Sequence, residues 1–358
     1  MNNVHDDRFY DTDVPYVFHK GTNYDIGLRH GKIARERIDK NIKTYERFYK
    51  ETAKITWKEA NNRAKKFIPY IQEKMPLIMD ELRGIADGSG QDLIDILTLN
   101  VRSEICLTNY SDGCSSISQQ NKEDKDIYIS QNWDWLTELN EGIIILDIQP
   151  TDKPRMLMMT EAGIIAKIGF NDKGLGLMLN AIMCGVSQVA LPVHFAIRRC
   201  LEAESTQQAI SELEDLGIAS TANLMLADNR GNFLTVEASP KGFAFIEPDD
   251  NLVVAHTNHL YASKKYVTDH PIPDSFSRLA RLVDLSKNSE ATYDDIRRRL
   301  SDEENYPHSI DRGFVGDVVG FDAMVTIATL IVDISKLEGE ISFGRPSSHP
   351  KRYQLFFS

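Results

Sequence analysis

The stretch Asp112-Gly113-Cys114-Ser115-Ser116 stands where the pattern of the chain changes from helix to strand. Before it, apolar residues recur at helical spacing. After it, segments are short, rich in β-branched residues and bounded by turn residues. Because an Asp-Gly pair is typical of a turn, Cys114 is expected where a turn enters a strand. The local pattern leaves two interpretations of this cysteine open, a buried strand residue or a nucleophile that attacks carbonyl carbon.

Helices are predicted on the N-terminal side of this stretch. Pro76 permits a break between two of them, since proline interrupts the hydrogen bonds of a helix. The segment 87–90, with the sequence Asp-Gly-Ser-Gly, is expected to end the third helix at a turn. The predicted helices span residues 24–50, 57–75, 77–86 and 92–100.

Strands dominate on the C-terminal side, with helices between them, so the chain is expected to be α+β. Segments 171–174 and 228–231 are interpreted as hairpin turns. The polar segment 119–126 is also interpreted as a hairpin, and the alternative is a linker in a two-domain structural protein. Predicted strands span 127–130, 142–148, 156–160, 166–170, 325–333 and 339–343, and predicted helices span 192–204, 206–216, 275–286 and 293–300.

Composition and charge exclude several classes of protein. The chain has 358 residues, of which 42% are hydrophobic and 26% charged, close to the globular average. Its net charge of −12 argues against a general nucleic-acid binder, because phosphate requires a basic surface. Residues 1–113 hold 18 basic and 18 acidic side chains, so the whole acidic excess follows position 113. The apolar run 324–332 is too short for a membrane span.

The cysteine count and the motifs that are missing narrow the function further. Four cysteines do not form a disulfide framework, and the acidic N-terminus shows no targeting segment, so a cytoplasmic protein is expected. No close Cys/His pair has the spacing of a zinc site, and no metal is predicted. The chain contains neither a glycine-rich phosphate loop nor a Gly-x-Ser-x-Gly elbow.

Two polar motifs at strand ends are candidates for catalysis. Gln131-Asn132-Trp133-Asp134-Trp135 places an amide and a carboxylate between tryptophans. It is interpreted either as a turn with aromatic packing or as polar groups beside a reacting centre. Ala255-His256-Thr257-Asn258-His259 follows an apolar run, and Asn258 is a candidate amide donor to an oxyanion. Its two histidines are interpreted as hydrogen-bonded loop residues.

These motifs resemble the acyl-coenzyme A:6-aminopenicillanic acid acyltransferase (isopenicillin N acyltransferase-like) family, which are peptidase C45-type N-terminal-nucleophile hydrolases. DGCSS at 112–116 resembles the cleavage and nucleophile site, and QNWDW at 131–135 resembles the segment with the family's aspartate. Seven strings follow the family's order between Gly21 and Pro346. The other five are TEAGIIAKIGFNDKGLGLMLNA at 160–181, EASP at 237–240, HTNH at 256–259, DEENYPHSI at 302–310 and GRP at 344–346.

The resemblance implies a fold and a maturation step. The implied fold is a four-layer αββα sandwich of the N-terminal nucleophile hydrolase type, preceded by a helix-rich segment. The resemblance also implies an inactive precursor that cleaves its own Gly113–Cys114 bond. Cleavage would give a helix-rich fragment 1–113 and a nucleophile-bearing fragment 114–358, which stay associated as one folded domain. The change of pattern near residue 112 is then a processing site rather than a domain boundary.

The resemblance further implies roles for individual residues. Cys114 matches the nucleophile, and its freed α-amino group, with a pKa of roughly 7.7–8, suits a general base. Ser116 matches a hydroxyl needed near the cleavage site, and Asp134 matches the aspartate that orients the amino terminus. Asn258 matches the oxyanion-stabilising asparagine, and Ser239 matches a further serine of the family.

Three more residues, Asn132, Glu161 and His256, are predicted as supporting groups. The family's fungal type member also has an arginine near the start of the late apolar strand, whereas the stretch 319–324 has none. Arg312 is the nearest earlier candidate. This departure concerns penicillin-type substrate recognition, and it leaves the nucleophile and the processing untouched.

The expected function is that of a self-cleaving N-terminal cysteine amidohydrolase or acyltransferase. An acyl-thioester on Cys114 would pass its acyl group to water or to an amine. The expected partner is a small-molecule N-acyl amide or acyl thioester. No cofactor is expected, although acyl-CoA is a candidate substrate. The alternatives are a bile-salt or penicillin amidase-like N-terminal cysteine hydrolase and an unprocessed, non-catalytic binding protein on the same fold.

Overall fold

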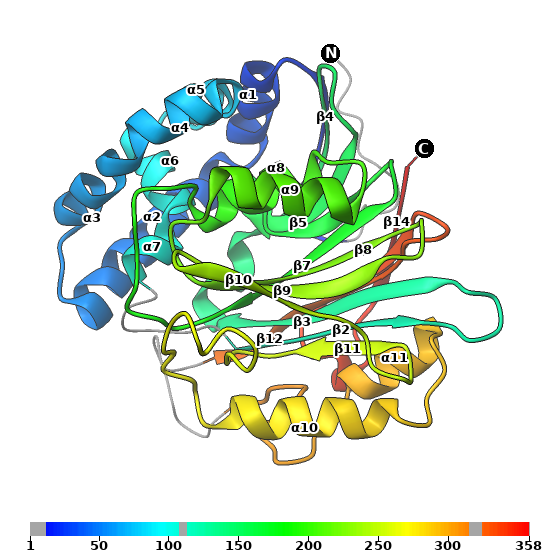
Figure 1. Ribbon diagram of the computed structural model, residues 1–358. Helices are drawn as coiled ribbons and strands as arrows, with labels where there is room; N and C mark the ends of the chain where they lie inside the picture. Colours follow the sequence, from blue (N-terminus) through cyan, green and yellow to red (C-terminus); the bar gives the residue numbers. More distant parts are fainter. Residues whose placement is uncertain (1–11, 107–112, 315–323, 358) are drawn as a thin grey trace.

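Two β-sheets lie face to face at the centre of the molecule, and helices cover the outer face of each (Figure 1). The computed structural model describes residues 12–106, 113–314 and 324–357. Asp112 of the Cys114 motif lies outside the described residues. So does almost all of the stretch 319–324, which lacks the family's arginine.

The first sheet has eight strands in the order β1-β4-β5-β6-β7-β8-β9-β10. Its edge strand β1 comes from the N-terminal part of the chain and pairs with β4 in parallel, whereas the other pairs are antiparallel. The strands are β1 Tyr16–Gly21, β4 Ile143–Pro150, β5 Met156–Glu161, β6 Ile168–Asn171, β7 Leu175–Ala181, β8 Ala222–Asp228, β9 Phe233–Ser239 and β10 Gly242–Ile246.

The second sheet is antiparallel, with six strands in the order β11-β2-β3-β12-β13-β14. Its neighbouring strands β2 and β3 pair from Gly113 with Asp134 to Gln120 with Ile127. The polar segment 119–126 is therefore a hairpin, as predicted, and not a linker between domains. The strands are β2 Gly113–Gln120, β3 Ile127–Leu136, β11 Val253–His256, β12 Met324–Asp333, β13 Glu338–Phe343 and β14 Arg352–Phe356.

Helices complete two outer layers. The N-terminal helices, together with α8 and α9, lie on the side of the first sheet, whereas α10 and α11 cover the second (Figure 1). The expected four-layer αββα sandwich with a helix-rich N-terminal segment is confirmed. None of the helices in the described ranges combines the length and apolar character that a membrane span requires. The helices are α1 Asn23–Ile33, α2 Arg35–Phe48, α3 Trp57–Ala64, α4 Ile68–Lys74, α5 Pro76–Ser89, α6 Leu93–Asn100, α7 Arg102–Cys106, α8 Val193–Leu201, α9 Thr206–Leu216, α10 Asp274–Ser286 and α11 Tyr293–Leu300.

The predicted helices are correct in type but not in their ends. The helix predicted over 24–50 is interrupted at Ala34, which separates α1 from α2. A 3-10 turn likewise divides the one predicted over 57–75. The predicted stop at residue 87 is wrong, because α5 continues to Ser89 and ends at Gly90, whose φ of +73° suits a glycine cap.

The strands β1, β10 and β14 lie outside every predicted strand and flank none of the predicted hairpin turns. Each is the edge strand of its sheet, and each exposes or half-exposes most of its residues. A strand with one free edge and few buried side chains carries a weak apolar pattern, so periodicity does not reveal it.

Four glycines bring α1 and α5 into direct backbone contact. A Cβ built on Gly27 would lie 1.9 Å from the carbonyl oxygen of Glu81, and one on Gly84 would lie 2.2 Å from that of Tyr24. Gly31 and Gly88 are as tightly enclosed, each by the backbone of the other helix. Since real Cβ atoms do not approach backbone this closely, the crossing requires glycine on both helices.

Candidate active site

Cys114 lies second in β2, the strand that the sequence motif predicts. Its side chain is 1% exposed and belongs to the main apolar core, whereas Ile117, of opposite strand parity, belongs to the core under α10 and α11. Because side chains alternate along a strand, Cys114 and Ser116 face the space between the sheets, and Ser115 faces the helices. The Ser115 hydroxyl indeed accepts a hydrogen bond from Arg278 of α10 at 3.1 Å.

Asn258 holds the backbone nitrogen of Cys114. It follows β11, which pairs with β2, so the two residues meet at the same end of the sheet. The Asn258 Oδ1 accepts from the Cys114 N–H at 2.8 Å and from Arg278 Nη2 at 2.9 Å. The Asn258 Nδ2 donates to the carbonyl of Ala181 at 3.0 Å. In this arrangement the amide oxygen, and not the amide nitrogen, faces Cys114.

Asp134 lies opposite Gly113 in the β2–β3 ladder and is fully buried. Its carboxylate accepts from the Thr326 hydroxyl at 2.6 Å and from Arg312 Nε at 3.3 Å. Burial raises the pKa of Asp134 to about 7, while the charges of Arg312 and Arg278 and the hydrogen bond from Thr326 act to lower it. A carboxyl that titrates near neutral pH beside the predicted cleavage site is suited to proton transfer.

Gly113 packs tightly against this carboxylate. A Cβ at this position would lie 2.9 Å from Arg312 Nε, 3.0 Å from Asp134 Oδ2 and 3.0 Å from Met324 Sδ. The Gly113 N–H also donates to Met324 Sδ at 3.0 Å. A larger residue at this point of the chain would therefore require the ends of these three side chains to shift. The Asp134 carboxyl lies beside Gly113, and the Asn258–Arg278 pair contacts Cys114.

A family model and a curated relative match the chain. Residues 120–348 match the model for acyl-coenzyme A:6-aminopenicillanic acid acyl-transferase. The chain belongs to this acyltransferase family. It is also similar to the acyl-coenzyme A:6-aminopenicillanic-acid-acyltransferase 40 kDa form of Emericella nidulans, with 29% identity over 348 residues and 96% of both chains covered. This membership confirms the predicted family and supports an acyl-transfer or amide-hydrolysis activity.

Solved structures with low sequence identity are also similar to this acyltransferase-family chain. The conjugated bile acid hydrolase from Clostridium perfringens has 14% identity and a TM-score of 0.48, covering 68% of this chain and 97% of its own. An N-acylethanolamine-hydrolyzing acid amidase ortholog from Caenorhabditis elegans has 15% identity and a TM-score of 0.45, with 68% and 100% covered. The penicillin V acylase from Agrobacterium tumefaciens has 13% identity and a TM-score of 0.45, with 68% and 86% covered.

Two other predicted residues of this family member lie close to Cys114 in the strands. Ser116 is fully buried, and within the described ranges its hydroxyl has no hydrogen-bond partner. Asn132 lies opposite Ser115, and its Nδ2 donates to the carbonyls of Leu300 and Ile310 at 2.8 and 3.0 Å. Asn132 therefore anchors the segment that leads to Arg312, and a supporting part in catalysis stays a prediction.

Glu161 and Ser239 make their hydrogen bonds and ion pairs elsewhere. Glu161 accepts from the Tyr45 hydroxyl at 2.6 Å and pairs with Arg102 at 3.0 Å, so it joins the N-terminal helices to the first sheet. The Ser239 hydroxyl donates to the carbonyl of Gly242 at 2.8 Å in the turn between β9 and β10. A part for either in catalysis stays a prediction.

His256 is hydrogen-bonded, as its motif suggested, but it is the last residue of β11 and not a loop residue. Its two ring nitrogens lie 2.9 Å from the Thr257 carbonyl and 3.0 Å from Glu237 Oε1. Although burial acts to raise it, the pKa of Glu237 is lowered to about 2 by His256 and by backbone N–H groups of residues 261 and 263. The pair shapes the loop that follows Asn258.

The start of α10 was not predicted as part of the site. Its side chains contact Cys114 in β2 and Asn258, which follows β11. Ser275 Oγ accepts from the backbone N–H of Asn258 at 2.8 Å, and Arg278 Nη1 donates to the carbonyl of Cys114 at 2.9 Å. Asp274 pairs with Arg278 at 2.7 Å. The spacing of Asp274 and Arg278 by four residues at a predicted helix start was the available signal. Arg312, the nearest earlier candidate for the family's arginine, donates to Asp134 Oδ2 at 3.3 Å.

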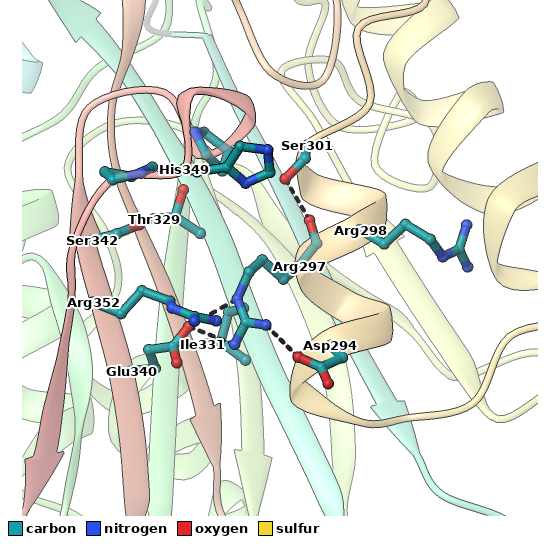
Figure 2. A pocket seen from close by; sticks show the side chains of 12 residues that line it. Asp294, Arg297, Arg298, Ser301, Thr329, Ile331, Glu340, Ser342, His349 and Arg352 are labelled. Carbon is teal, nitrogen blue, oxygen red and sulfur yellow. Dashed lines mark hydrogen bonds and ion pairs between the residues drawn. The ribbon is translucent and has the colours of Figure 1, made fainter.

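A separate hollow of about 540 Å³ lies on the outer face of the second sheet, beside α11 (Figure 2). Arg297 crosses it and donates to Glu340 Oε1 through Nε at 3.0 Å and Nη2 at 2.8 Å, and it also pairs with Asp294. Arg298 points away from Arg297 in Figure 2 and pairs with Asp295. These guanidinium groups already have carboxylate partners, and the pair between Arg297 and Glu340 joins α11 to β13. The hollow is therefore not assigned to the reaction.

Proposed function

We propose that the chain is a self-activating acyltransferase or amide hydrolase, in which Cys114 becomes the N-terminal residue and the nucleophile. The observation that carries this proposal is the enclosure of the Gly113–Cys114 bond. Asp134 and Arg312 contact Gly113, and Asn258 and Arg278 hold Cys114. Membership of the acyltransferase family supports the same class of reaction.

The first step converts the peptide bond into a thioester. The Cys114 thiol attacks the Gly113 carbonyl carbon, the carbon–nitrogen bond breaks, and the thiol proton goes to the departing nitrogen. Water then hydrolyses the thioester, which leaves a carboxylate on Gly113 and a free amine and thiol on Cys114. Asp134, with a pKa near 7, is the group we assign to proton transfer in this step.

In the mature protein the Cys114 amine acts as the base for its own thiol, since its pKa lies near neutral pH. The thiol attacks the substrate's acyl carbon, an acyl-thioester forms, and water or an amine takes the acyl group. This reaction requires no cofactor, and an acyl-CoA or an N-acyl amide would serve as donor. Asn258 Nδ2 carries two N–H groups and gives one to the Ala181 carbonyl, and we propose that the other stabilises the oxyanion.

The contacts between the two proposed fragments support their lasting association. β1 adds a parallel strand to the first sheet, and the α5 carboxylate Glu81 receives two hydrogen bonds from Arg198 of α8 at 2.8 and 2.7 Å. Both side chains of this pair are buried. Separating fragment 1–113 would expose these charges and a large apolar area, which is unfavourable. A cytoplasmic location stays a prediction from the cysteine count.

Mass spectrometry of the purified protein under denaturing conditions tests the proposal. We expect two chains, residues 1–113 and 114–358, that elute together under native conditions. A chain that stays intact after long incubation at neutral pH would instead favour the non-catalytic binding protein. A cleaved enzyme that hydrolyses N-acyl amides, but never transfers the acyl group to an amine, would favour the amidase-like alternative.

Activity should fall with acid as Asp134 takes up a proton. The carboxyl has a pKa near 7 in the folded protein, above its ordinary value of 3.8, so it is ionised above that pH and protonated below it. We expect the rate of precursor cleavage to drop about tenfold for each pH unit below 7. The measurement is the cleavage rate at pH 5 to 9, which is monitored by electrophoresis. Asp134→Asn should lose this pH limb, and a limb that persists in the variant would assign it to another group.

A cavity of about 420 Å³ next to Asp134 is the site we propose for the acyl group. Its lining is mainly apolar and includes Phe314, Val325 and Ile327, together with Thr326, whose hydroxyl holds Asp134. In the mature enzyme the substrate's acyl carbon would take the place of the Gly113 carbonyl carbon. Because Gly113 contacts Met324 at the start of β12, the acyl group would continue along this strand into the cavity.

Ile327→Trp should shorten the acyl chains that the enzyme accepts. The indole would fill much of the cavity, so kcat/KM for a long acyl-CoA should fall at least about tenfold, while that for acetyl-CoA changes little. A chain-length series of acyl-CoA thioesters measures this, with the acetyl donor as the internal control. Equal losses for all chain lengths would contradict this place for the acyl group.

A further inference from the structure

One carboxylate joins the two arginines that serve the two sides of the Gly113–Cys114 bond. Asp274 Oδ2 accepts from Arg278 Nε at 2.7 Å and also from Arg312 Nη2. The side chains of Asp274, Arg278 and Arg312 are 14%, 1% and 6% exposed, so the cluster is largely shielded from water.

The two arginines have different targets. Arg278 donates to the Cys114 carbonyl and to Asn258 Oδ1, both at 2.9 Å. Arg312 donates to Asp134 Oδ2 at 3.3 Å. Two buried cations repel each other. Burial is the largest effect that lowers the pKa of Arg278, and the charge of Arg312 is the next largest. Asp274 supplies the negative charge that allows both guanidinium groups to stay in this place.

We propose that Asp274 is a positioning residue, whose carboxylate clamps Arg278 onto Cys114 and Asn258 and clamps Arg312 onto Asp134. The catalytic part of this inference rests on the proposed function. Asp274 acts through the arginines and does not itself contact Gly113 or Cys114 by any hydrogen bond found in the described ranges.

The charges around Asp134 determine the direction in which its pKa would move if Asp274 were replaced. The charged and titratable groups that face it are Arg312 and Asp311 from the segment before β12, and Arg278 and Asp274 from α10. His308 lies behind Arg312, at 3.3 Å from its Nη1. Arg312 and Arg278 lower the pKa of Asp134, whereas Asp311 raises it. If loss of Asp274 releases the arginines, the pKa of Asp134 rises. If the arginines stay in place, removal of a nearby anion leaves it unchanged or lowers it.

The test measures the titration of Asp134 in Cys114→Ala, which cannot cleave itself through this thiol. Chains labelled with ¹³C at the aspartate carboxyl carbons are titrated by NMR, with Asp134→Asn assigning the signal. In Asp274→Asn we expect the Asp134 titration to move up by about one pH unit or more, a tenfold change in the protonation equilibrium. Asp274→Glu should restore most of the original value. Asp274→Ser, which removes the carboxylate and leaves room for water, should give the same upward shift if the asparagine variant does not fold.

The control is Asp302→Asn, which removes one of the two carboxylate partners of Arg281, one turn further along α10. It should leave the titration of Asp134 unchanged. A folded Asp274→Asn or Asp274→Ser protein whose Asp134 titrates as before, or at lower pH, would overturn the proposal.

Turnover provides a second readout that separates this inference from the proposed function. In the otherwise unchanged chain, Asp274→Asn should move the acid limb of kcat/KM in the same direction as the carboxyl titration. If the unsubstituted chain neither cleaves itself nor transfers acyl groups, the proposed function fails, and the titration in Cys114→Ala still decides the role of Asp274.

Discussion

Cys114→Ala will remain a single chain of 358 residues and will show no acyl transfer. The thiol is the only nucleophile that the proposed mechanism provides for attack on the Gly113 carbonyl. Without that attack the Cys114 amine is not released. The expected loss is therefore complete for cleavage, and at least about 10⁴-fold for kcat. Mass spectrometry after incubation at pH 7–8 follows cleavage, and release of coenzyme A from acyl-CoA donors follows turnover.

Cys184→Ala is the matched control. Cys184 is also a buried cysteine of the C-terminal part, but it lies in a small apolar cluster with Ile182, Leu260 and Val267. Its substitution removes a thiol without removing the proposed nucleophile, so cleavage and turnover should continue. A Cys114→Ala chain that still divides between residues 113 and 114 would show that another group starts the reaction.

Gly27→Val will separate α1 from α5 and strongly destabilise the fold. The added Cβ would meet the Glu81 carbonyl oxygen at 1.9 Å, and backbone cannot turn aside as a side chain does. Moving α5 also disturbs the buried pair between Glu81 and Arg198. We expect the free energy of unfolding to fall by about 3 kcal/mol or more. Urea unfolding followed by circular dichroism measures this, in Cys114→Ala so that one chain unfolds.

Gly185→Ala is the control for the helix crossing. A Cβ at Gly185 would meet nothing within 4 Å, and its φ lies outside the left-handed region, so the expected change is within about 0.5 kcal/mol. An unfolding free energy of Gly27→Val equal to that of Gly185→Ala would mean that α1 and α5 can move apart without loss. The crossing would then not contribute to holding fragment 1–113 in place.

The position of the cluster around Asp274 explains why periodicity did not find it. Arg312 is 178 residues from Asp134 and 38 from Asp274. Asp274 and Arg312, each taken alone, are typical of a solvated helix or loop. Only the pairing of β2 with β3 and β11, and the packing of α10 on their ends, brings the charges together around Cys114.

The sequence by itself determined the class of the fold and the family. Helical and strand periodicity are local, so most helices and the central strands follow from the order of apolar residues. The Cys114 motif and the HTNH motif are likewise short strings, and their order and spacing can be found in the sequence without a structure. The predicted ends of helices were less accurate. In α5 the helix continues through Gly88, which packs against the backbone of α1, and no local pattern records this contact.

Only the tertiary structure decided how the charges and the chain edges are used. The edge strands β1, β10 and β14 form because a sheet offers free hydrogen-bonding groups, which no local pattern records. Asp134 has a pKa near 7 because folding removes water from it, an effect that outweighs the lowering of the pKa by Arg312 and Arg278. Burial and long-range pairing set the chemistry of these groups, and both exist only once the two sheets and α10 have come together.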